Sequence, residues 1–192
     1  AMREISWNPV NLDLNATALV RARTLSEVAK SLTSAGSLSI SLPTGEGVEL
    51  VGFEAGGRRT TSLLVDGEYP PVRRLFPEVT TTHAVVLTQQ LVEAARRVSL
   101  VAERNTPIRL AFSEGEVVLE AGQGEDAQAS EAIEAVLEGE AITTAYNPSY
   151  LLDALGAVGQ EYTRLSFTHG TKPSVITGQS SLEGSEDDGF RY

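Results

Sequence analysis

The sequence lacks cysteine altogether and contains only two histidines in 192 residues. The absence of cysteine excludes disulfide bonds, cysteine-bound zinc and thiol catalysis, and it fits a reducing compartment. No apolar run approaches the roughly 20 residues that a membrane-spanning helix needs, and no signal-peptide pattern opens the chain. We therefore expect a cytoplasmic protein that does not enter a membrane.

Signatures of catalysis are also missing. His83 stands at the expected start of a strand and His169 in an expected hairpin turn, positions typical of edge or loop histidines. The chain has no Gly-x-Ser-x-Gly elbow, no phosphate-binding loop and no His-Glu-x-x-His helix. The carboxylates of residues 114–140 lack metal-ligand spacing, so we interpret them as a solvated acidic face. The sequence predicts no catalytic residue, no cofactor and no metal site.

The composition is globular, with 41% hydrophobic and 21% charged residues, and the length suits one large or two small domains. A net charge of −11 argues against DNA binding by overall charge. The charge is uneven, however, because acids gather in residues 114–140 and 182–189. We expect the second acidic stretch to be a mobile loop. Basic residues gather elsewhere in the sequence. DNA contact through a local basic face therefore stays open as an interpretation.

Three segments, 16–53, 82–122 and 141–178, share one pattern. Each is predicted to form a short strand, a helix of about three turns, and two alternating strands joined by a tight polar turn. Strands such as 108–112 and 165–167 alternate apolar and polar residues, which favours antiparallel sheets with one packed face. The same alternation runs through residues 38–42. The segments therefore predict an α+β fold made of repeated helix-plus-strands units.

Each predicted helix has a start signal. Thr24-Leu-Ser-Glu27 has the form of a capping box, Thr88 is a candidate N-cap, and Asn147 precedes Pro148, which suits the first helical position. Behind each start, apolar residues at helical spacing predict one buried stripe per helix. The stripe residues are Leu25, Val28, Ala29 and Leu32; Leu91, Ala95 and Val98; and Leu151, Leu155 and Val158.

The most specific stretches are "LVDGEYPPVRRLFPE", "RRVSLVAERNTPIRLAF" and "AYNPSYLLDAL". Together they resemble the bacterial DNA polymerase III beta subunit, the sliding clamp family, and the resemblance spans nearly the whole chain. It implies a DNA clamp fold of paired half-domains, with sheets outside and helices lining the inner face of a ring around duplex DNA. It also implies that residues 1–77 are the second half of the middle domain plus the interdomain connector. Residues 78–192 would be the C-terminal domain without its last strand.

The resemblance implies a non-catalytic processivity factor that is a homodimer when full length. Its partners would be duplex DNA, the DNA polymerase III alpha subunit, the clamp loader and repair polymerases, the proteins binding through short Leu/Phe-containing peptides. The implied peptide-binding groove contains Pro70, Arg74, Leu75, Asn147, Tyr150 and Val175. The implied DNA-facing residues are Arg21, Arg23, Lys30, Arg96 and Arg97. The implied ring interface contains Ser99 and Leu100.

Other interpretations stay open at this point. The proline-rich stretch 67–78 also fits a plain stiff linker, and the basic residues also fit solvated helix faces. A second function is a stand-alone, clamp-derived peptide-binding adaptor or inhibitor that does not encircle DNA. Groove residues without the ring parts would be its hallmark.

Overall fold

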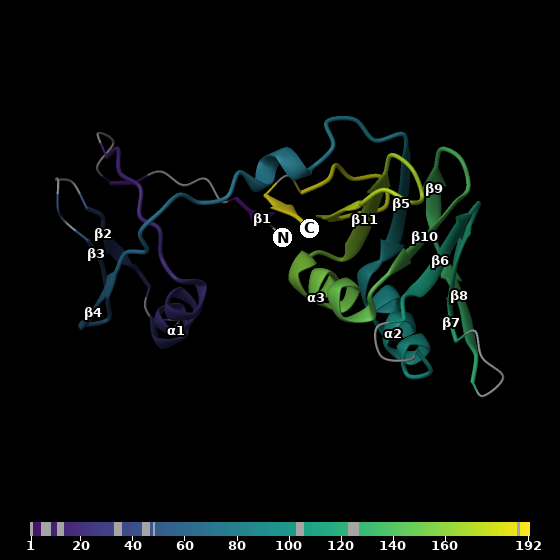
Figure 1. The fold of residues 1–192 in the computed structure, drawn as a ribbon, viewed down its shortest axis with the longest axis horizontal. Coiled ribbons are helices and arrows are strands. Elements are labelled where there is room, and N and C mark those ends of the chain that lie inside the picture. The colour runs from purple at the N-terminus through teal and green to yellow at the C-terminus, as the bar shows by residue number, and fades with distance from the viewer. Residues whose placement is uncertain are drawn as a thin grey trace. The chain divides into compact units, whose positions relative to one another are not determined.

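The structure is a computed structural model that describes residues 2–4, 9–10, 14–32, 36–43, 47, 49–102, 106–122, 127–187 and 189–192. The chain divides into two compact units. The small unit is Ser6–Pro71, and the large unit combines Ala1–Ile5 with Val72–Tyr192. Figure 1 labels their helices and strands. Within the described residues, every helix is too short or too polar to cross a membrane.

The large unit contains two four-stranded antiparallel sheets and two helices. Its elements are β1 (Met2–Arg3), the 3-10 helix η1 (Val72–Leu75), β5 (Thr82–Leu87), α2 (Thr88–Ser99), β6 (Ile108–Ser113), β7 (Glu116–Ala121), β8 (Ala129–Glu134), β9 (Val136–Glu138), β10 (Ile142–Tyr146), α3 (Pro148–Val158), β11 (Tyr162–Phe167), β12 (Val175–Gln179) and β13 (Phe190–Arg191). The sheet orders are β10-β6-β7-β8 and β12-β11-β5-β9, and β1 forms a separate antiparallel pair with β13.

The two halves of the large unit exchange strands. β5 precedes α2 but pairs with β11, whereas β10 precedes α3 but pairs with β6. The strand before each helix therefore joins the sheet formed after the other helix. Because neither half can complete its sheet alone, we expect the large unit to fold as one cooperative body.

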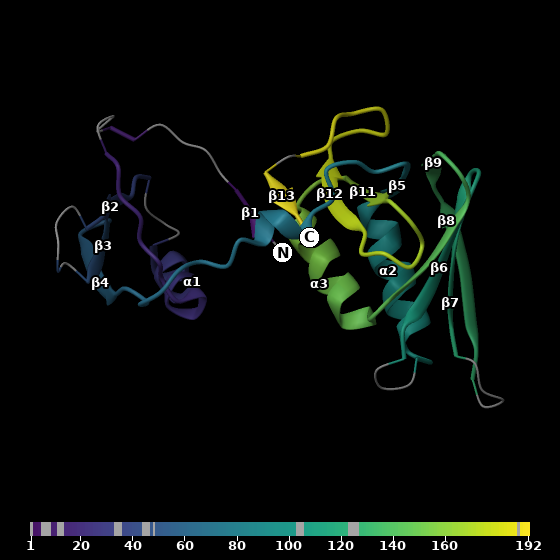
Figure 2. The same cartoon turned by 45° about the horizontal axis from the view of Figure 1, so that its top comes forward.

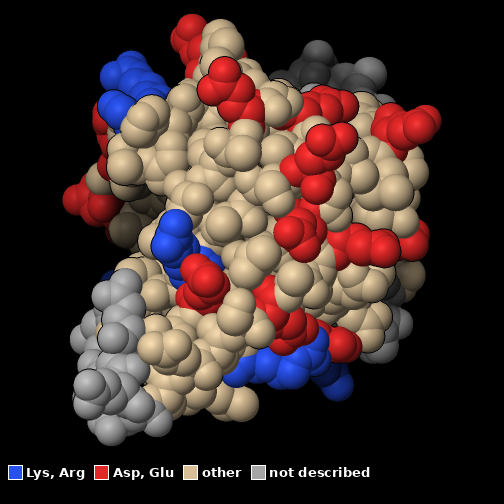
Figure 3. Space-filling model, turned by 90° about the vertical axis from the view of Figure 1, so that its right-hand side faces the viewer, with Lys and Arg blue, Asp and Glu red and all other residues tan. Residues whose placement is uncertain are grey.

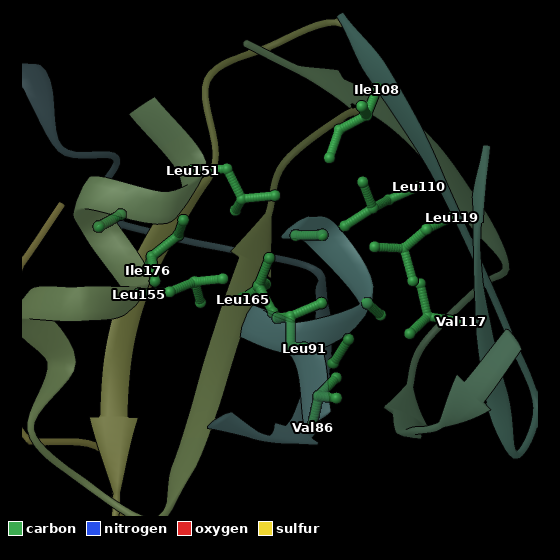
Figure 4. Close-up of a cluster of buried hydrophobic side chains, with 14 of the residues drawn as sticks. Val86, Leu91, Ile108, Leu110, Val117, Leu119, Leu151, Leu155, Leu165 and Ile176 are labelled. Carbon is green, nitrogen blue, oxygen red and sulfur yellow. The ribbon is translucent and has the colours of Figure 1, made fainter. Parts of the chain in front are cut away.

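The core of the large unit lies between the helices and the two sheets. Figures 1 and 2 show α2 and α3 side by side, and Figure 4 shows side chains from the helices and sheets converging. Phe112 of one sheet contacts Phe167 of the other, with ring centroids 5.3 Å apart. Such aromatic pairs add to the free energy gained by burial, so this contact helps to fix one sheet against the other.

The predicted strand alternation is confirmed in β6, where Ile108, Leu110 and Phe112 are buried and Arg109 is exposed. It is wrong in β11, where Ser166 is buried like its neighbours. Ser166 pairs in register with His83 of the neighbouring strand β5, and its Oγ lies 3.0 Å from the His83 Nδ1, so its cross-strand neighbour helps to bury this serine.

The predicted stripes of α2 and α3 are confirmed, since all six of their apolar residues are buried. The N-cap prediction is confirmed at Asn147, whose side chain accepts a hydrogen bond from the Ser149 N–H at 3.0 Å. It is wrong at Thr88, because α2 already begins there and Leu87 is the N-cap. The hydroxyl of Thr88 instead lies 2.9 Å from that of Thr163.

The small unit is one helix on a three-stranded antiparallel sheet. Its elements are α1 (Ala22–Leu32), β2 (Ser39–Ser41), β3 (Leu50–Ala55) and β4 (Arg58–Leu63), and the sheet order is β2-β3-β4. The capping box predicted at Thr24 is wrong, because α1 starts at Ala22. The Leu25 N–H already donates to the Arg21 carbonyl oxygen at 3.0 Å, so Thr24 lies inside the first turn.

The core of the small unit is correspondingly small. Its buried apolar residues are Val28, Val51 and Phe53. Leu25 in the predicted stripe of α1 is exposed, and so is Ile40 in the predicted packed face of β2. A single helix covers only one strip of a sheet, so these apolar residues find no cover within the described part of the unit.

The acidic stretch 182–189 is predicted to be a mobile loop. Its described residues run back alongside β12. Gln179 pairs with Glu186, and the Asp187 N–H donates to the Gly178 carbonyl oxygen. Further on, Tyr192 and Ile176 exchange two backbone hydrogen bonds of 3.0 Å. The chain thereby adds backbone pairing beside β12, in the position that β8 occupies beside β7.

Candidate functional site

A pocket of about 540 Å³ opens in the large unit. It forms where the end of β10, the first turn of α3, the loop between β11 and β12, and Tyr192 meet. Its lining residues are Thr144, Ala145, Tyr146, Asn147, Tyr150, Leu151, Gly170, Thr171, Lys172, Pro173, Ser174, Ile176 and Tyr192. Two of the six residues predicted for the peptide groove, Asn147 and Tyr150, are among them.

The inner part of the pocket is apolar and electrically neutral. Leu151 and Ile176 are buried members of the core and form part of its lining. The Tyr146 hydroxyl lies 2.5 Å from the Ser174 hydroxyl, and burial raises the pKa of Tyr146 to about 12. This phenol therefore stays protonated at neutral pH, and the pocket can accept an apolar side chain without meeting a charge there.

Asn147 has a structural role at the start of α3. Its backbone is extended, with φ −63° and ψ 124°, and its Oδ1 accepts the Ser149 N–H at the start of α3. An N–H donor requires an oxygen acceptor, so this bond also fixes the orientation of the side-chain amide. The Nδ2 group of Asn147 is therefore the donor of this side chain.

Tyr150 and Tyr192 supply aromatic surface at the mouth of the pocket. Tyr150 is 64% exposed, although it belongs to the helix whose other face is buried. The pKa of Tyr192 is raised, first by burial and then by the negative charge of Asp153 and by Tyr150. An exposed aromatic ring beside an apolar pocket is the kind of residue that anchors a bound peptide.

The loop between β11 and β12 is held by local hydrogen bonds. The Thr171 N–H donates to His169 Nδ1 at 3.3 Å, and the Lys172 N–H donates to the His169 carbonyl oxygen at 3.0 Å. A Cβ added at Gly170 would collide with the carbonyl oxygen of Thr143 on β10. The close approach of this loop to β10 therefore requires glycine at position 170, and it places Lys172 on the pocket lining.

The remaining predicted groove residues lie outside this lining. Val175 is buried, while its neighbours Ser174 and Ile176 line the pocket. Arg74 and Leu75 are on η1 of the large unit, where Leu75 is 78% exposed. Pro70 belongs to the small unit. The described pocket is thus built from the C-terminal part of the chain alone.

Three predicted DNA-facing residues lie at α1 of the small unit, and all are exposed. Arg21 immediately precedes the helix, and Lys30 is in its last turn. Arg23 forms an exposed ion pair with Glu27, with 3.3 Å between Nε and Oε1. Exposed pairs of this kind are weak, so this contact contributes little to stability.

The other two predicted DNA-facing residues, Arg96 and Arg97, are in the last turn of α2. Arg97 makes two hydrogen bonds to Glu131 of β8 and lies 3.7 Å from a carboxylate oxygen of Glu93. No ion pair joins Arg96 to a residue that the structure describes. The two neighbouring arginines therefore differ in how much positive charge they offer to a ligand.

The two residues predicted for the ring interface end α2. Ser99 donates its hydroxyl to the Arg96 carbonyl oxygen at 2.8 Å, and Leu100 is 83% exposed. The ring-interface role of these two residues stays a prediction.

Acidic residues spread over the sheet side of the large unit. Figure 3 shows them across the face that carries β7 and β8, with basic side chains gathered in a few places. Glu116, Glu120 and Glu134 are exposed there, and Arg109 lies 3.9 Å from Glu120. The basic residues of α2 thus lie on a helix, whereas the acidic residues of this face lie on β7 and β8.

The two histidines lie apart from any metal-binding cluster among the described residues. His83 lies in β5, near the hydroxyls of Ser166 and Thr80, and its pKa is lowered first by burial and then by the charge of Arg164. His169 lies in the loop after β11, as predicted. Within the part of the chain that the structure describes, no three His, Cys, Asp or Glu side chains are placed to hold a metal ion.

Sequence reasoning missed several pocket residues, among them Tyr146, Lys172, Ser174 and Tyr192. Tyr146 stands within the quoted stretch "AYNPSYLLDAL", directly before the N-cap, so proximity to Asn147 was an available signal. Lys172 follows His169 in the expected hairpin turn. Its place beside α3 depends on β10 lying next to the β11–β12 loop, which a local pattern does not reveal.

Comparison with known proteins gives consistent matches. The family model "DNA polymerase III beta subunit, central domain" matches residues 1–71, and "DNA polymerase III beta subunit, C-terminal domain" matches residues 73–186. The beta sliding clamp of Streptomyces coelicolor is 46% identical over 193 residues, covering 100% of this chain and 51% of the relative. The "Beta sliding clamp homolog GriR" of Streptomyces muensis is 42% identical over 192 residues, with the same coverage.

Solved structures agree with these relatives. A DNA polymerase sliding clamp from Bacillus subtilis has a TM-score of 0.78 and 28% identity, covering 87% of this chain and 44% of that one. A Pseudomonas aeruginosa sliding clamp bound to griselimycin has a TM-score of 0.77 and 29% identity, covering 85% of this chain and 44% of that one. The chain spans about half the length of the curated relatives it matches.

Proposed function

The chain belongs to the DNA polymerase III beta subunit family, and from this premise we propose that it is part of a sliding clamp. Such a clamp is a non-catalytic processivity factor that encircles duplex DNA and tethers replication and repair proteins. We assign residues 1–77 to the second half of the middle domain with its connector, and residues 78–192 to the C-terminal domain. The two matched models meet between residues 71 and 73, and the compact units also part at Pro71, so both boundaries fall within the connector that this division assigns to the first part.

The tethering site is the pocket at the start of α3. A short peptide from the polymerase alpha subunit, the clamp loader or a repair polymerase inserts a leucine or phenylalanine there. The observation that carries this proposal is the combination of an apolar interior, from Leu151 and Ile176, with an exposed aromatic at Tyr150. Arg74 and Leu75 of the same unit extend the site in this proposal.

DNA contact is assigned to the basic residues of α1 and α2. Arg21, Arg23, Lys30 and Arg96 are exposed, and loose contacts to phosphates position a ring without reading sequence. A clamp holds DNA by topology, so these contacts need not be strong. Ser99 and Leu100 contribute to the subunit contact of the full-length homodimer.

The experiment that tests tethering measures binding of a fluorescently labelled Leu/Phe-containing peptide to the 192-residue chain by anisotropy. Tyr150→Ala is expected to weaken binding about 10-fold, the size typical of an aromatic anchor. The change should leave folding intact because Tyr150 is largely exposed. Leu182→Ala, another exposed apolar residue that does not line this pocket, is the matched control and should bind normally. Equal affinities in wild type and Tyr150→Ala would remove this pocket from the tethering site.

A further inference from the structure

A second pocket, of about 390 Å³, opens in the large unit at the start of α2. It forms where the end of β5, the first turn of α2, the turn between β6 and β7, and the junction of β8 and β9 meet. Tyr162 of β11 and Leu182 of the acidic stretch complete its walls. The pocket at the start of α2 shares no lining residue with the pocket at the start of α3.

The two pockets occupy equivalent places in the two halves of the large unit. Leu87 is the N-cap of α2 and Asn147 is the N-cap of α3, and each lines the pocket beside its helix. Gln90 and Tyr150, each three residues after the N-cap, line the same two pockets. The β6–β7 turn stands where the β11–β12 loop stands in the other half, and the end of β8 stands where Tyr192 pairs beside β12. The repeated fold therefore builds one concave site twice, with different side chains in each.

The walls of the pocket at the start of α2 are mainly apolar. Val85 and Leu87 of β5 and Tyr162 of β11 form one part, and Val136 of β9 and Leu182 form another. Val136 and Leu182 are 44% and 45% exposed. Because burial of apolar surface is favourable, a partner side chain that covers these two residues gains free energy of binding.

Hydrogen bonds hold these walls in place before any ligand arrives. The Ala135 N–H donates to the Gly115 carbonyl oxygen at 3.1 Å, which joins the β8–β9 junction to the β6–β7 turn. The buried side chain of Gln179 donates through Nε2 to the carbonyl oxygens of Ser181 and Leu182, at 2.6 and 3.0 Å. Walls fixed in this way lose less conformational entropy when a ligand binds.

The rim of this pocket is acidic. Glu134 lines the pocket, is exposed, and forms no ion pair with any residue in the described part of the chain. Further exposed glutamates are sequence neighbours of lining residues, namely Glu114, Glu116, Glu161 and Glu183. No lysine or arginine is among the described residues that line the pocket, and Arg164, the cross-strand neighbour of Val85, lies outside the lining. A ligand with positive charge is complementary to this rim.

We propose that the pocket at the start of α2 is a second docking site, which binds a segment of a partner protein that carries lysine or arginine on both sides of an apolar residue. The apolar side chain covers Val136 and Leu182, and the flanking cations lie near Glu134 and its neighbouring carboxylates. The same negative charge disfavours a nucleic acid, an anionic membrane or a second copy of this chain, whose net charge is −11. This inference goes beyond the tethering function and does not depend on it.

The test titrates a labelled peptide, one leucine flanked by two arginines on each side, into the 192-residue chain and follows its anisotropy. The salt concentration is about 0.15 M, at which exposed charges more than about 8 Å apart are largely screened. One matched peptide has glutamine in place of arginine, and another has serine in place of leucine. Each should bind at least about 3-fold more weakly, because each lacks either the charge or the apolar group. Equal affinity of the arginine–leucine peptide and either matched peptide overturns the inference.

Two variants with the same change in net charge test the place of binding. Glu134→Gln should weaken binding of the arginine–leucine peptide about 2- to 3-fold. Glu120→Gln removes an exposed carboxylate near the other end of β7, outside the lining, and should bind as wild type does. Equal effects of the two variants would mean general attraction to the acidic face, and they overturn the inference.

A competition experiment distinguishes the two pockets. An excess of unlabelled Leu/Phe-containing peptide without basic residues should leave the labelled arginine–leucine peptide bound. Complete displacement would place both peptides in the pocket at the start of α3, which overturns the second site and leaves the tethering function intact. If the Leu/Phe-containing peptide fails to bind in its own titration, the tethering proposal fails, and the two glutamate variants still decide this inference.

Discussion

Arg97 at the end of α2 binds Glu131 of β8 through two parallel hydrogen bonds, from Nε to Oε2 at 3.0 Å and from Nη2 to Oε1 at 2.5 Å. The arrangement is bidentate, which gives an arginine–carboxylate pair directional specificity. It joins the helix to the second strand of the β7–β8 pair and commits one of the two neighbouring arginines of α2 to a contact within the protein.

This pair predicts a pH-dependent contribution to stability. The hydrogen bonds from Arg97 hold the pKa of the Glu131 carboxyl below its ordinary value of 4.5. Its stabilising contribution is therefore complete above the pKa of an unfolded glutamate, and it is lost as pH falls through the lower pKa of the folded state. Glu131→Gln should lower the Tm by at most about 4 °C at pH 7 and by less at pH 3, which lies below the pKa of an unfolded glutamate.

The measurement compares thermal unfolding of wild type and Glu131→Gln at the two pH values. Glu134→Gln is the matched control, since Glu134 is an exposed carboxylate of the same strand without an ion pair to a described residue. It should show no comparable pH-dependent difference. A Glu131→Gln deficit of the same size at pH 3 as at pH 7 contradicts the pKa argument.

The same contact predicts unequal roles for Arg96 and Arg97 in DNA binding. Arg97 is neutralised by Glu131 and Glu93, whereas Arg96 has no ion pair with a described residue. Arg96→Gln should weaken binding to duplex DNA at low salt and reduce the slope of log affinity against log salt by about 0.9, the value for one lost phosphate contact. Arg97→Gln should change the slope less. The reverse ranking, measured by titrating DNA across a salt series, would show that Arg97 exchanges Glu131 for phosphate.

Asn147 allows capping and ligand binding to be separated. Asn147→Asp keeps an oxygen to accept the Ser149 N–H, and aspartate caps helices as well as asparagine does. It lacks the Nδ2 donor, however, and adds a negative charge close to the peptide. We expect unchanged thermal stability and several-fold weaker peptide binding. Asn147→Ala should lose about 1 kcal/mol of unfolding free energy as well, because the cap is removed. Unchanged peptide affinity in Asn147→Asp would mean that Nδ2 does not contact the ligand.

Predictions from the sequence are most accurate where the local signals of a helix agree with the packing of its side chains. The start of α3 followed from Asn147-Pro148, and the buried stripe followed from the spacing of Leu151, Leu155 and Val158. The sequence failed where a tertiary contact or an earlier start competed with the local signal. Thr88 pairs with Thr163 instead of capping its helix, and α1 begins ahead of Thr24.

The candidate site was only partly predictable for a related reason. Asn147 and Tyr150 come from one contiguous stretch, which local pattern and family resemblance both mark. Lys172 and Tyr192 reach the pocket through strand exchange between the halves and through pairing beside β12. Such placement depends on contacts between residues far apart in the chain, and helix or strand periodicity does not report them.

The most direct test of the central claim is a map of backbone amide shifts in the 192-residue chain during titration with a Leu/Phe-containing peptide. We predict that the largest shifts fall on residues 144–151 and 170–176 and on Tyr192, and that Tyr150→Ala suppresses them at the same peptide concentration. The β7–β8 face should stay unchanged. Saturating shifts confined to another surface, or a map in Tyr150→Ala identical to that of wild type, would contradict the account.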